Sequence, residues 1–260
     1  MMSSMLAELN QKFFVSTVDI DGVPVEITRT HGVGKTLIML PGAQGTSETF
    51  YRQILAWGFK HDVISINYPA GKNAATQAAF LLRLIKFLGV EKFDILGTSY
   101  GAYLAQWIAL ASPTSVSRLV LGNGFFDPRP AQTLEKLQHL ESSTPEAIKE
   151  EVIARLEKSP ESELRSAMLY LIGQKQSPQA VRDRMLAVQR ADVVPAMAFP
   201  GSHMLLIDCD NDPLISPEMR EAMRQRYPDA QHSTIAGGGH YPYISAPDAY
   251  NRVVAAFLDL

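Results

Sequence analysis

The chain has 260 residues, which is long enough to form one large domain with a sizeable core. Hydrophobic residues make up 46% of it and charged residues 20%, so the composition excludes a disordered or fibrous protein and favours a globular one. The 24 Lys and Arg residues are balanced by 27 Asp and Glu residues, and this near-neutral charge argues against nucleic acid or a membrane surface as a partner.

The sequence shows neither a targeting signal nor a disulfide. Residues 1–11 lack the basic and apolar regions of a signal peptide, and no apolar run approaches the roughly eighteen residues of a membrane helix. The single cysteine, Cys209, has no partner for an internal disulfide and lies in an apolar stretch, which predicts a small buried hydrophobic side chain. We therefore expect a cytoplasmic protein.

An antiparallel hairpin is predicted near the start of the chain. Residues 14–30 alternate between apolar and polar on both sides of Asp21-Gly22, and this dipeptide in such a setting favours a tight two-residue turn. Gly34-Lys35-Thr36 resembles the end of a phosphate-binding loop. However, Arg29 occupies the position of the first glycine, and a strand follows where a helix is required. These departures argue against nucleotide binding.

From residue 36 onward, apolar runs alternate with helical patterns, which indicates parallel strands joined by crossover helices. The runs that are apolar and rich in β-branched residues predict strands at residues 36–40, 63–67, 93–96 and 118–122. Helical spacing of apolar residues predicts helices at residues 48–57, 74–88 and 100–111, and Asn73 is placed to cap the second.

Residues 127–200 show helical signals only. A capping residue before a first-turn proline predicts helix starts at Thr144-Pro145, Ser159-Pro160 and Ser177-Pro178. The α/β pattern then resumes, with strands predicted at residues 204–208 and 232–235 and helices at residues 217–226 and 247–258. We predict one α/β domain formed by residues 1–126 and 201–260, interrupted by an all-helical insertion at residues 127–200.

The stretch with the clearest chemistry is Gly97-Thr98-Ser99-Tyr100-Gly101, which lies between a predicted strand and a predicted helix. A serine on a sharp strand-to-helix turn is lifted above the sheet edge, and flanking glycines permit the close backbone approach that the turn requires. The pattern is weak by itself. Its setting between a strand and a helix favours a nucleophile elbow with Ser99 as the nucleophile.

A serine hydroxyl needs a base to activate it and a third group to orient the base. His240 follows Gly237-Gly238-Gly239 directly after the last predicted strand, where it can reach over the sheet edge, and we predict that it is the base. The acid is expected in the loop after the preceding strand. Asp212 is preferred because it opens the turn into the next helix, and Asp210 and Asp127 remain alternatives.

Acyl transfer also needs N–H donors for the developing oxyanion. Tyr100, directly after the nucleophile, is predicted to supply one backbone N–H, and the loop after residues 36–40 is predicted to supply another from Ala43, with Gln44 next. No metal-ligand spacing or cofactor fingerprint appears, so no metal and no cofactor is predicted. The residues that could line a substrate pocket, with core packing an equal interpretation for the aromatic ones, are Gln44, Phe125, Phe126 and Tyr241.

The elbow motif, Asp212 and His240, in this chain order, resemble the α/β-hydrolase superfamily over nearly the whole chain. The resemblance implies an α/β-hydrolase fold: a mostly parallel central sheet with an N-terminal antiparallel hairpin, flanking helices and an inserted helical cap over the active site. A serine at the elbow disfavours the haloalkane dehalogenase and epoxide hydrolase branches, which carry aspartate there. Pro41 departs from the superfamily, since a histidine commonly precedes the glycine of this loop.

A narrower resemblance is to the maspardin-like α/β hydrolases. It rests on four segments, Arg52-Gln53-Ile54-Leu55, Asn67-Tyr68-Pro69, Tyr227-Pro228-Asp229-Ala230 and Gly238-Gly239-His240-Tyr241-Pro242-Tyr243. Maspardin resembles an interaction protein that has not kept the acid and base positions, so the likeness implies that a protein partner is possible. This chain has Asp212 and His240 at those positions, which favours catalysis.

The sequence thus predicts a serine hydrolase that cleaves a small or medium carboxylic ester or thioester through an acyl-enzyme intermediate. One alternative is a non-catalytic, maspardin-like binding protein. Another is a lyase or acyltransferase that uses the same three residues, because the fold does not fix the reaction.

Overall fold

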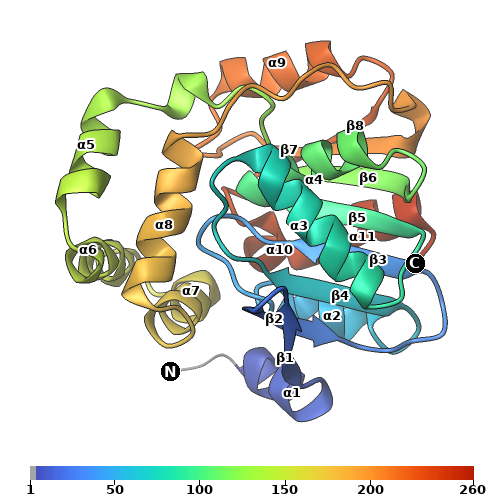
Figure 1. Ribbon diagram of the computed structural model, residues 1–260, viewed down its shortest axis with the longest axis horizontal. Helices are drawn as coiled ribbons and strands as arrows, with labels where there is room; N and C mark the ends of the chain where they lie inside the picture. The colour runs from blue at the N-terminus through green and yellow to red at the C-terminus, as the bar shows by residue number, and fades with distance from the viewer. Residues whose placement is uncertain (1–3) are drawn as a thin grey trace.

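An eight-stranded β-sheet forms the centre of the computed structural model, which describes residues 4–260 (Figure 1). The strand order is β1-β2-β4-β3-β5-β6-β7-β8. The β1–β2 and β2–β4 pairs are antiparallel and the other pairs are parallel, which confirms the predicted sheet with an antiparallel start. The strands are β1 (Val15–Ile20), β2 (Val23–Arg29), β3 (Thr36–Leu40), β4 (Asp62–Asn67), β5 (Phe93–Thr98), β6 (Val116–Gly122), β7 (Met204–Cys209) and β8 (Gln231–Ile235).

The hairpin at the sheet edge turns at Asp21 and Gly22, as predicted. Their φ angles are 56° and 79°, and positive φ at both central residues gives a two-residue turn that matches the twist of paired strands. Ile20 pairs with Val23 directly across the turn.

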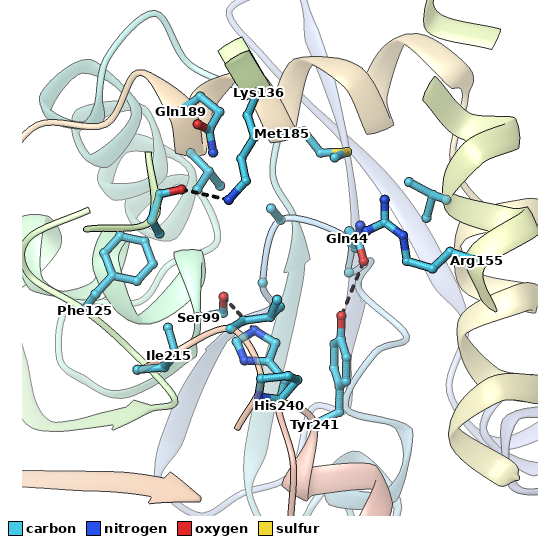
Figure 2. Close-up of a pocket in the computed structure, with 18 of the residues that line it drawn as sticks. Gln44, Ser99, Phe125, Lys136, Arg155, Met185, Gln189, Ile215, His240 and Tyr241 are labelled. Atoms are coloured by element: carbon cyan, nitrogen blue, oxygen red, sulfur yellow. Dashed lines mark hydrogen bonds between the residues drawn. The ribbon is translucent and has the colours of Figure 1, made fainter. Parts of the chain in front are cut away.

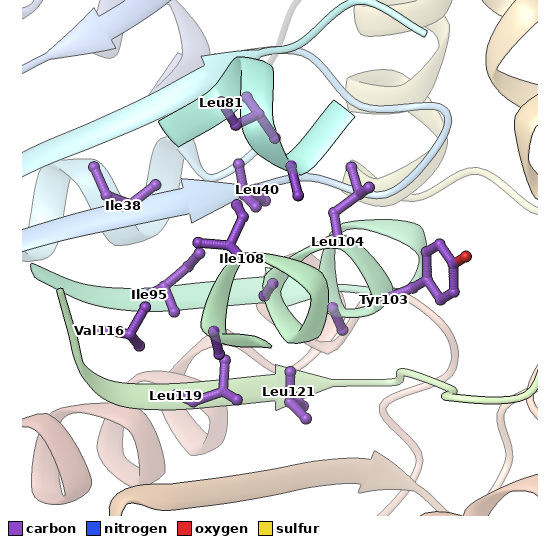
Figure 3. Packing of buried hydrophobic residues seen from close by; sticks show 14 of the residues in the cluster. Ile38, Leu40, Leu81, Ile95, Tyr103, Leu104, Ile108, Val116, Leu119 and Leu121 are labelled. Carbon is purple, nitrogen blue, oxygen red and sulfur yellow. The ribbon is translucent and has the colours of Figure 1, made fainter. Parts of the chain in front are cut away.

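Helices cover both faces of the sheet. Successive side chains of a strand point to opposite faces, so Ile38 and Leu40 of β3 join the core with α3 and α4, while Leu37 and Met39 join the core with α2 and α11. Figure 3 shows the first of these layers, with α4 lying across β3, β5 and β6. The helices of the α/β part are α1 (Ser4–Lys12), α2 (Tyr51–Trp57), α3 (Ala74–Phe87), α4 (Tyr100–Ala111), α9 (Pro217–Arg226), α10 (Pro242–Ser245) and α11 (Pro247–Leu258).

The segment between β6 and β7, residues 127–200, contains helices and no strand, and we call it the helical segment. Its four α-helices lie together beside the sheet, at the left of Figure 1. Thr144 and Ser177 cap two of them as predicted, because their hydroxyls accept the backbone N–H of the third residue along. The segment holds η1 (Arg129–Ala131), α5 (Leu134–Ser142), α6 (Pro145–Glu157), α7 (Glu163–Gly173) and α8 (Pro178–Gln189), and η2 (Gly201–His203) leads into β7.

The start of α7 is predicted wrongly by the sequence pattern. Ser159 lies just after α6 and starts no helix, since its backbone N–H donates to Leu156 O at 3.0 Å and its hydroxyl donates to Arg155 O at 3.3 Å. Ser162 is the capping residue, and its hydroxyl accepts from the backbone of Arg165. A Ser-Pro pair is therefore ambiguous when a second serine follows within one turn.

The start of α2 also differs from the prediction, which placed it at residue 48. The backbone N–H of Thr46 donates to the hydroxyl of Thr49 at 2.7 Å, and the backbone of Thr49 donates back to Thr46 O at 3.1 Å. These two bonds hold residues 46–49 in a turn, so the helix begins only at Tyr51.

Candidate active site

Ser99 occupies the turn between β5 and α4, which is the strand–turn–helix setting that the sequence predicts. Its φ is 53° and its ψ is −121°, a strained combination for a residue with a side chain. The Ser99 N–H donates to Gly122 O of the neighbouring strand at 2.8 Å, which helps hold the turn in place.

Two glycines make this turn possible through close packing of backbones. A Cβ on Gly97 would lie 2.3 Å from Gly101 O, and a Cβ on Gly101 would lie 2.0 Å from Leu40 O. Neither distance can hold a carbon atom without a shift of the backbone. The same packing brings the loop after β3 against the serine, since a Cβ on Gly42 would lie 3.2 Å from Ser99 Cβ.

His240 lies between Ser99 and Asp212. Its Nε2 is 3.0 Å from Ser99 Oγ, and its Nδ1 is 2.8 Å from Asp212 Oδ2 and 3.0 Å from Oδ1. An ionised carboxylate only accepts hydrogen bonds, so Nδ1 carries the proton and Nε2 is left with a lone pair that can accept the Ser99 hydroxyl. His240 is 7% exposed and Asp212 is 8% exposed, so water has little access to the pair.

The Asp212 carboxylate is held ionised by a set of donors. Burial acts to raise the pKa of Asp212, but the hydrogen bond and charge of His240, with donors from Leu214 and Asn123, lower the pKa below its ordinary value. Oδ1 accepts the backbone N–H of Leu214 at 2.8 Å and that of Ile215 at 3.1 Å.

The two alternative acids make other contacts. Asp210 Oδ1 accepts the backbone N–H of Gly237 at 2.8 Å, and Asp127 forms an ion pair with Arg129 at 2.6 Å. Of the three candidates, Asp212 is the one that contacts His240. The choice of Asp212 as the acid therefore has geometric support.

Asn123 holds Asp212 in place beside His240, and the sequence pattern did not single out this asparagine. Its Nδ2 donates to Asp212 Oδ2 at 2.7 Å and to Gly239 O at 3.2 Å, which ties the acid to the histidine loop. Asn123 follows β6 with a φ of 44°, a left-handed conformation that asparagine tolerates better than most residues. The signal available was Gly122-Asn123-Gly124 at the end of a strand next to the elbow.

The predicted oxyanion donors lie beside the serine. Tyr100 is the first residue of α4, where a backbone N–H has no partner inside the helix. Within residues 4–260, the backbone N–H groups of Ala43 and Gln44 donate no hydrogen bond to the protein. Gly42, Ala43 and Gln44 line the same cavity as Ser99.

A cavity of about 500 Å³ opens over Ser99 and His240. Figure 2 shows the two residues at its base, with Phe125 and Ile215 on one side and Gln44 and Tyr241 on the other. Helices of the helical segment form much of the rest of the wall, where the resemblance to the superfamily implies a cap. Their apolar lining residues are Leu140, Ile148, Val152, Met168, Met185 and Val188, and their ionisable ones are Lys136, His139, Glu151 and Arg155.

Three of the four predicted pocket residues line this cavity, namely Gln44, Phe125 and Tyr241. Tyr241 also donates to the side chain of Gln44 at 3.3 Å. Phe126 does not line it, and its ring lies 5.1 Å from the guanidinium of Arg226.

The remaining residue types that commonly carry chemistry are the metal-ligating side chains and the single thiol. Residues 4–260 contain no group of three or more His, Cys, Asp or Glu side chains placed to hold a metal ion. Burial raises the pKa of the Cys209 thiol to about 11, which keeps this side chain protonated and a poor nucleophile. Within the same residues, no helix combines the length and apolar character that crossing a bilayer requires.

Known proteins are similar to this chain in sequence and architecture. Human maspardin is 28% identical over 248 residues, which cover 85% of this chain and 74% of maspardin. The putative carbamate hydrolase RutD of Klebsiella pneumoniae is 26% identical over 199 residues, covering 72% of this chain and 73% of that protein. The crystal structure of a hydrolase from Pseudomonas aeruginosa superposes with a TM-score of 0.78 at 18% identity, over 95% of this chain and 99% of that one.

The family-level comparison agrees with the fold. The model of the alpha/beta hydrolase family matches residues 37–253, which run from β3 to the last helix and include Ser99, Asp212 and His240. This chain therefore belongs to the α/β hydrolase family.

Proposed function

We propose that this protein is a serine hydrolase that cleaves a small or medium carboxylic ester or thioester through an acyl-enzyme intermediate. The observation that carries the proposal is the connected row of Ser99, His240 and Asp212, with 3.0 Å between Ser99 Oγ and His240 Nε2 and 2.8 Å between His240 Nδ1 and Asp212 Oδ2. Membership of the hydrolase family supports it.

In the first half of the reaction, Ser99 Oγ attacks the carbonyl carbon while His240 Nε2 takes the hydroxyl proton. The carbonyl oxygen becomes an oxyanion and accepts the backbone N–H groups of Tyr100 and Ala43, with Gln44 as the next choice. Asp212 stabilises the imidazolium that forms. The tetrahedral intermediate collapses, and the alcohol or thiol leaves with the proton from Nε2.

In the second half, a water molecule attacks the acyl carbon while His240 Nε2 takes one of its protons. The second tetrahedral intermediate uses the same backbone donors. When the bond to Ser99 Oγ breaks, the proton returns to this oxygen and the carboxylic acid is released, so the free enzyme is restored.

The helical segment acts in this proposal as a cap that sets the substrate, over a core formed by residues 1–126 and 201–260. The cavity of about 500 Å³ lies in the size range of small-molecule sites. Its wall from the helical segment is mostly aliphatic and thioether side chains, which suit an apolar acyl or alcohol group. We therefore expect esters of intermediate chain length to be preferred over acetate.

The test combines a fluorophosphonate probe with p-nitrophenyl esters of rising chain length. Wild type is expected to label and to turn over, and Ser99→Ala to lose labelling and at least about 10⁴-fold in kcat. Ser142→Ala removes an exposed serine of α5 and serves as a matched control with unchanged activity. If wild type neither labels nor exceeds the Ser99→Ala background, the hydrolase proposal fails and a binding role takes its place.

A further inference from the structure

The loop Pro41 to Gly45 is fixed by side chains from other parts of the chain. The hydroxyl of Tyr68 donates to Pro41 O, and Gln176 Nε2 donates to Gln44 O at 2.8 Å. The guanidinium of Arg184 donates to Gly45 O. Gln176 and Arg184 both belong to the helical segment, so this segment binds the loop that is expected to hold the oxyanion.

Arg184 is a buried cation whose partners are carbonyl oxygens. It is 3% exposed, and besides Gly45 O its guanidinium donates to Tyr68 O at 2.6 Å and to the side-chain oxygens of Asn67 and Gln176. It also lies 5.1 Å from the ring of Tyr68. Within residues 4–260, no carboxylate forms an ion pair with it. A buried charge is tolerated when oriented dipoles replace water, and the planar guanidinium is suited to several carbonyls at once.

Two hydrogen bonds and two peptide groups connect the Gln176 side chain to the N–H of Ala43. A peptide group is planar, so fixing its carbonyl also fixes the direction of its N–H. Gln176 fixes the peptide group of Gln44 O and Gly45 N, and Gly45 N donates to Gly42 O at 2.9 Å. Gly42 O shares its peptide group with Ala43 N. The direction of the Ala43 N–H is therefore set through two successive peptide groups.

We propose that Arg184 and Gln176 are positioning residues for the oxyanion site. Gln176 directs the Ala43 N–H toward the position beside Ser99 Oγ where negative charge develops, and Arg184 fixes the end of the same loop at Gly45 O. The proposal rests on the proposed hydrolase function and adds a second role for the helical segment, which supports the transition state as well as shaping the substrate cavity. Gly42 is in contact range of Ser99, so a small movement of the loop changes the distance from the donor to the reacting atoms.

The test compares two arginines of the same helix. Arg184→Ala is expected to lower kcat by about 10- to 100-fold with KM changed less than about threefold, because a misplaced donor weakens binding of the transition state and not of the ester. Arg182 donates to Leu140 O and Glu141 O, both inside the helical segment. Arg182→Ala is the matched control, and we expect its kcat to stay within about twofold even if its Tm falls.

Two further measurements separate positioning from folding. Guanidinium ion at millimolar concentration is expected to restore part of the kcat of Arg184→Ala and none of the kcat of Ser99→Ala. Gln176→Met retains the volume and removes the hydrogen bond to Gln44 O, together with the bond to Leu171 O and the one from Arg184. We therefore expect kcat to fall by roughly 3- to 10-fold. The rate of fluorophosphonate labelling should fall in parallel.

The outcomes distinguish this proposal from the hydrolase proposal. If wild type is active, but Arg184→Ala and Arg182→Ala lose kcat in the same proportion, or the Arg184→Ala loss lies wholly in KM, positioning is refuted and hydrolysis stands. If wild type shows neither labelling nor turnover above Ser99→Ala, both proposals fail together.

Discussion

The two sides of the candidate site are built in different ways. Ser99 and His240 are held within the α/β core, by backbones in close approach and by hydrogen bonds between neighbouring loops. The Pro41 to Gly45 loop is held in part by Gln176 and Arg184, which lie 132 and 139 positions from the residues they bind. The side of the site that holds Ser99 and His240, here called the nucleophile side, is thus built by the core. The side formed by Pro41 to Gly45, here called the oxyanion side, also depends on how the helical segment docks.

The largest predicted effect comes from replacing Asp212, the proposed acid of the nucleophile side. His240 Nδ1 lies within hydrogen-bond distance of both oxygens of the Asp212 carboxylate. Asp212→Asn replaces one of these acceptors with an NH₂ donor, so the imidazole is no longer held in the tautomer that can take a proton from Ser99. We expect kcat to fall by about 10³- to 10⁴-fold. Asp210→Asn, in the same loop, is the control and should change kcat less than about threefold. Steady-state kinetics decide, and the reverse order would identify Asp210 as the acid.

A second prediction tests whether close backbone packing holds this side. Gly101→Ala puts a Cβ 2.0 Å from Leu40 O, so β3 and α4 must move apart, and we expect a loss of at least about 3 kcal/mol in the free energy of unfolding. Gly173→Ala is the control, because its Cβ would meet only Ile153 Cδ1 at an ordinary 3.8 Å. Urea unfolding of both variants measures the difference, and equal stability would contradict the packing argument.

The smallest predicted effect is a dependence of the protein's stability on pH, which arises from the Asp212 carboxylate on the nucleophile side. The pKa of Asp212 is lowered in the folded protein, so its ionised form stabilises the fold above about pH 4, where an unfolded aspartate is ionised. This contribution is lost as the pH falls through the lower folded-state pKa. The stability advantage of wild type over Asp212→Asn should therefore shrink between neutral pH and about pH 3. Urea midpoints across this range test it, and a constant advantage would count against the assignment.

The sequence predicts the nucleophile side better than the oxyanion side, and the reason is physical. The elbow is a local pattern, since Gly97 and Gly101 act within one turn of Ser99. His240 and Asp212 follow because each comes directly after a strand of a parallel sheet, and such strands end at one edge.

The contacts that the sequence did not predict are long-range ones. Arg184 sits in a helix with a polar pattern, and nothing in its neighbourhood indicates that it is buried against a loop far earlier in the chain. The side-chain directions of Asn123 and Phe126, just after β6, could not be predicted either. They depend on backbone angles that the residue types alone do not give. In the helical segment, the starts of α6 and α8 could be predicted from Thr144 and Ser177, whereas the start of α7 was misplaced and α5, capped by Thr133, was not predicted. The contacts that dock these helices on the core could not be predicted.

The position of the helical segment in the chain has a consequence for engineering. It leaves the sheet after β6 and returns at β7, and these two strands pair directly in parallel, with Leu119 opposite Met204. A foreign segment of different length could be grafted between them without altering the strand register. The two proposals together imply that such a graft changes the substrate range and supports catalysis only if it also brings donors for the carbonyls of Gln44 and Gly45. Chimeras of this family should therefore be chosen by these two contacts before cavity shape is considered.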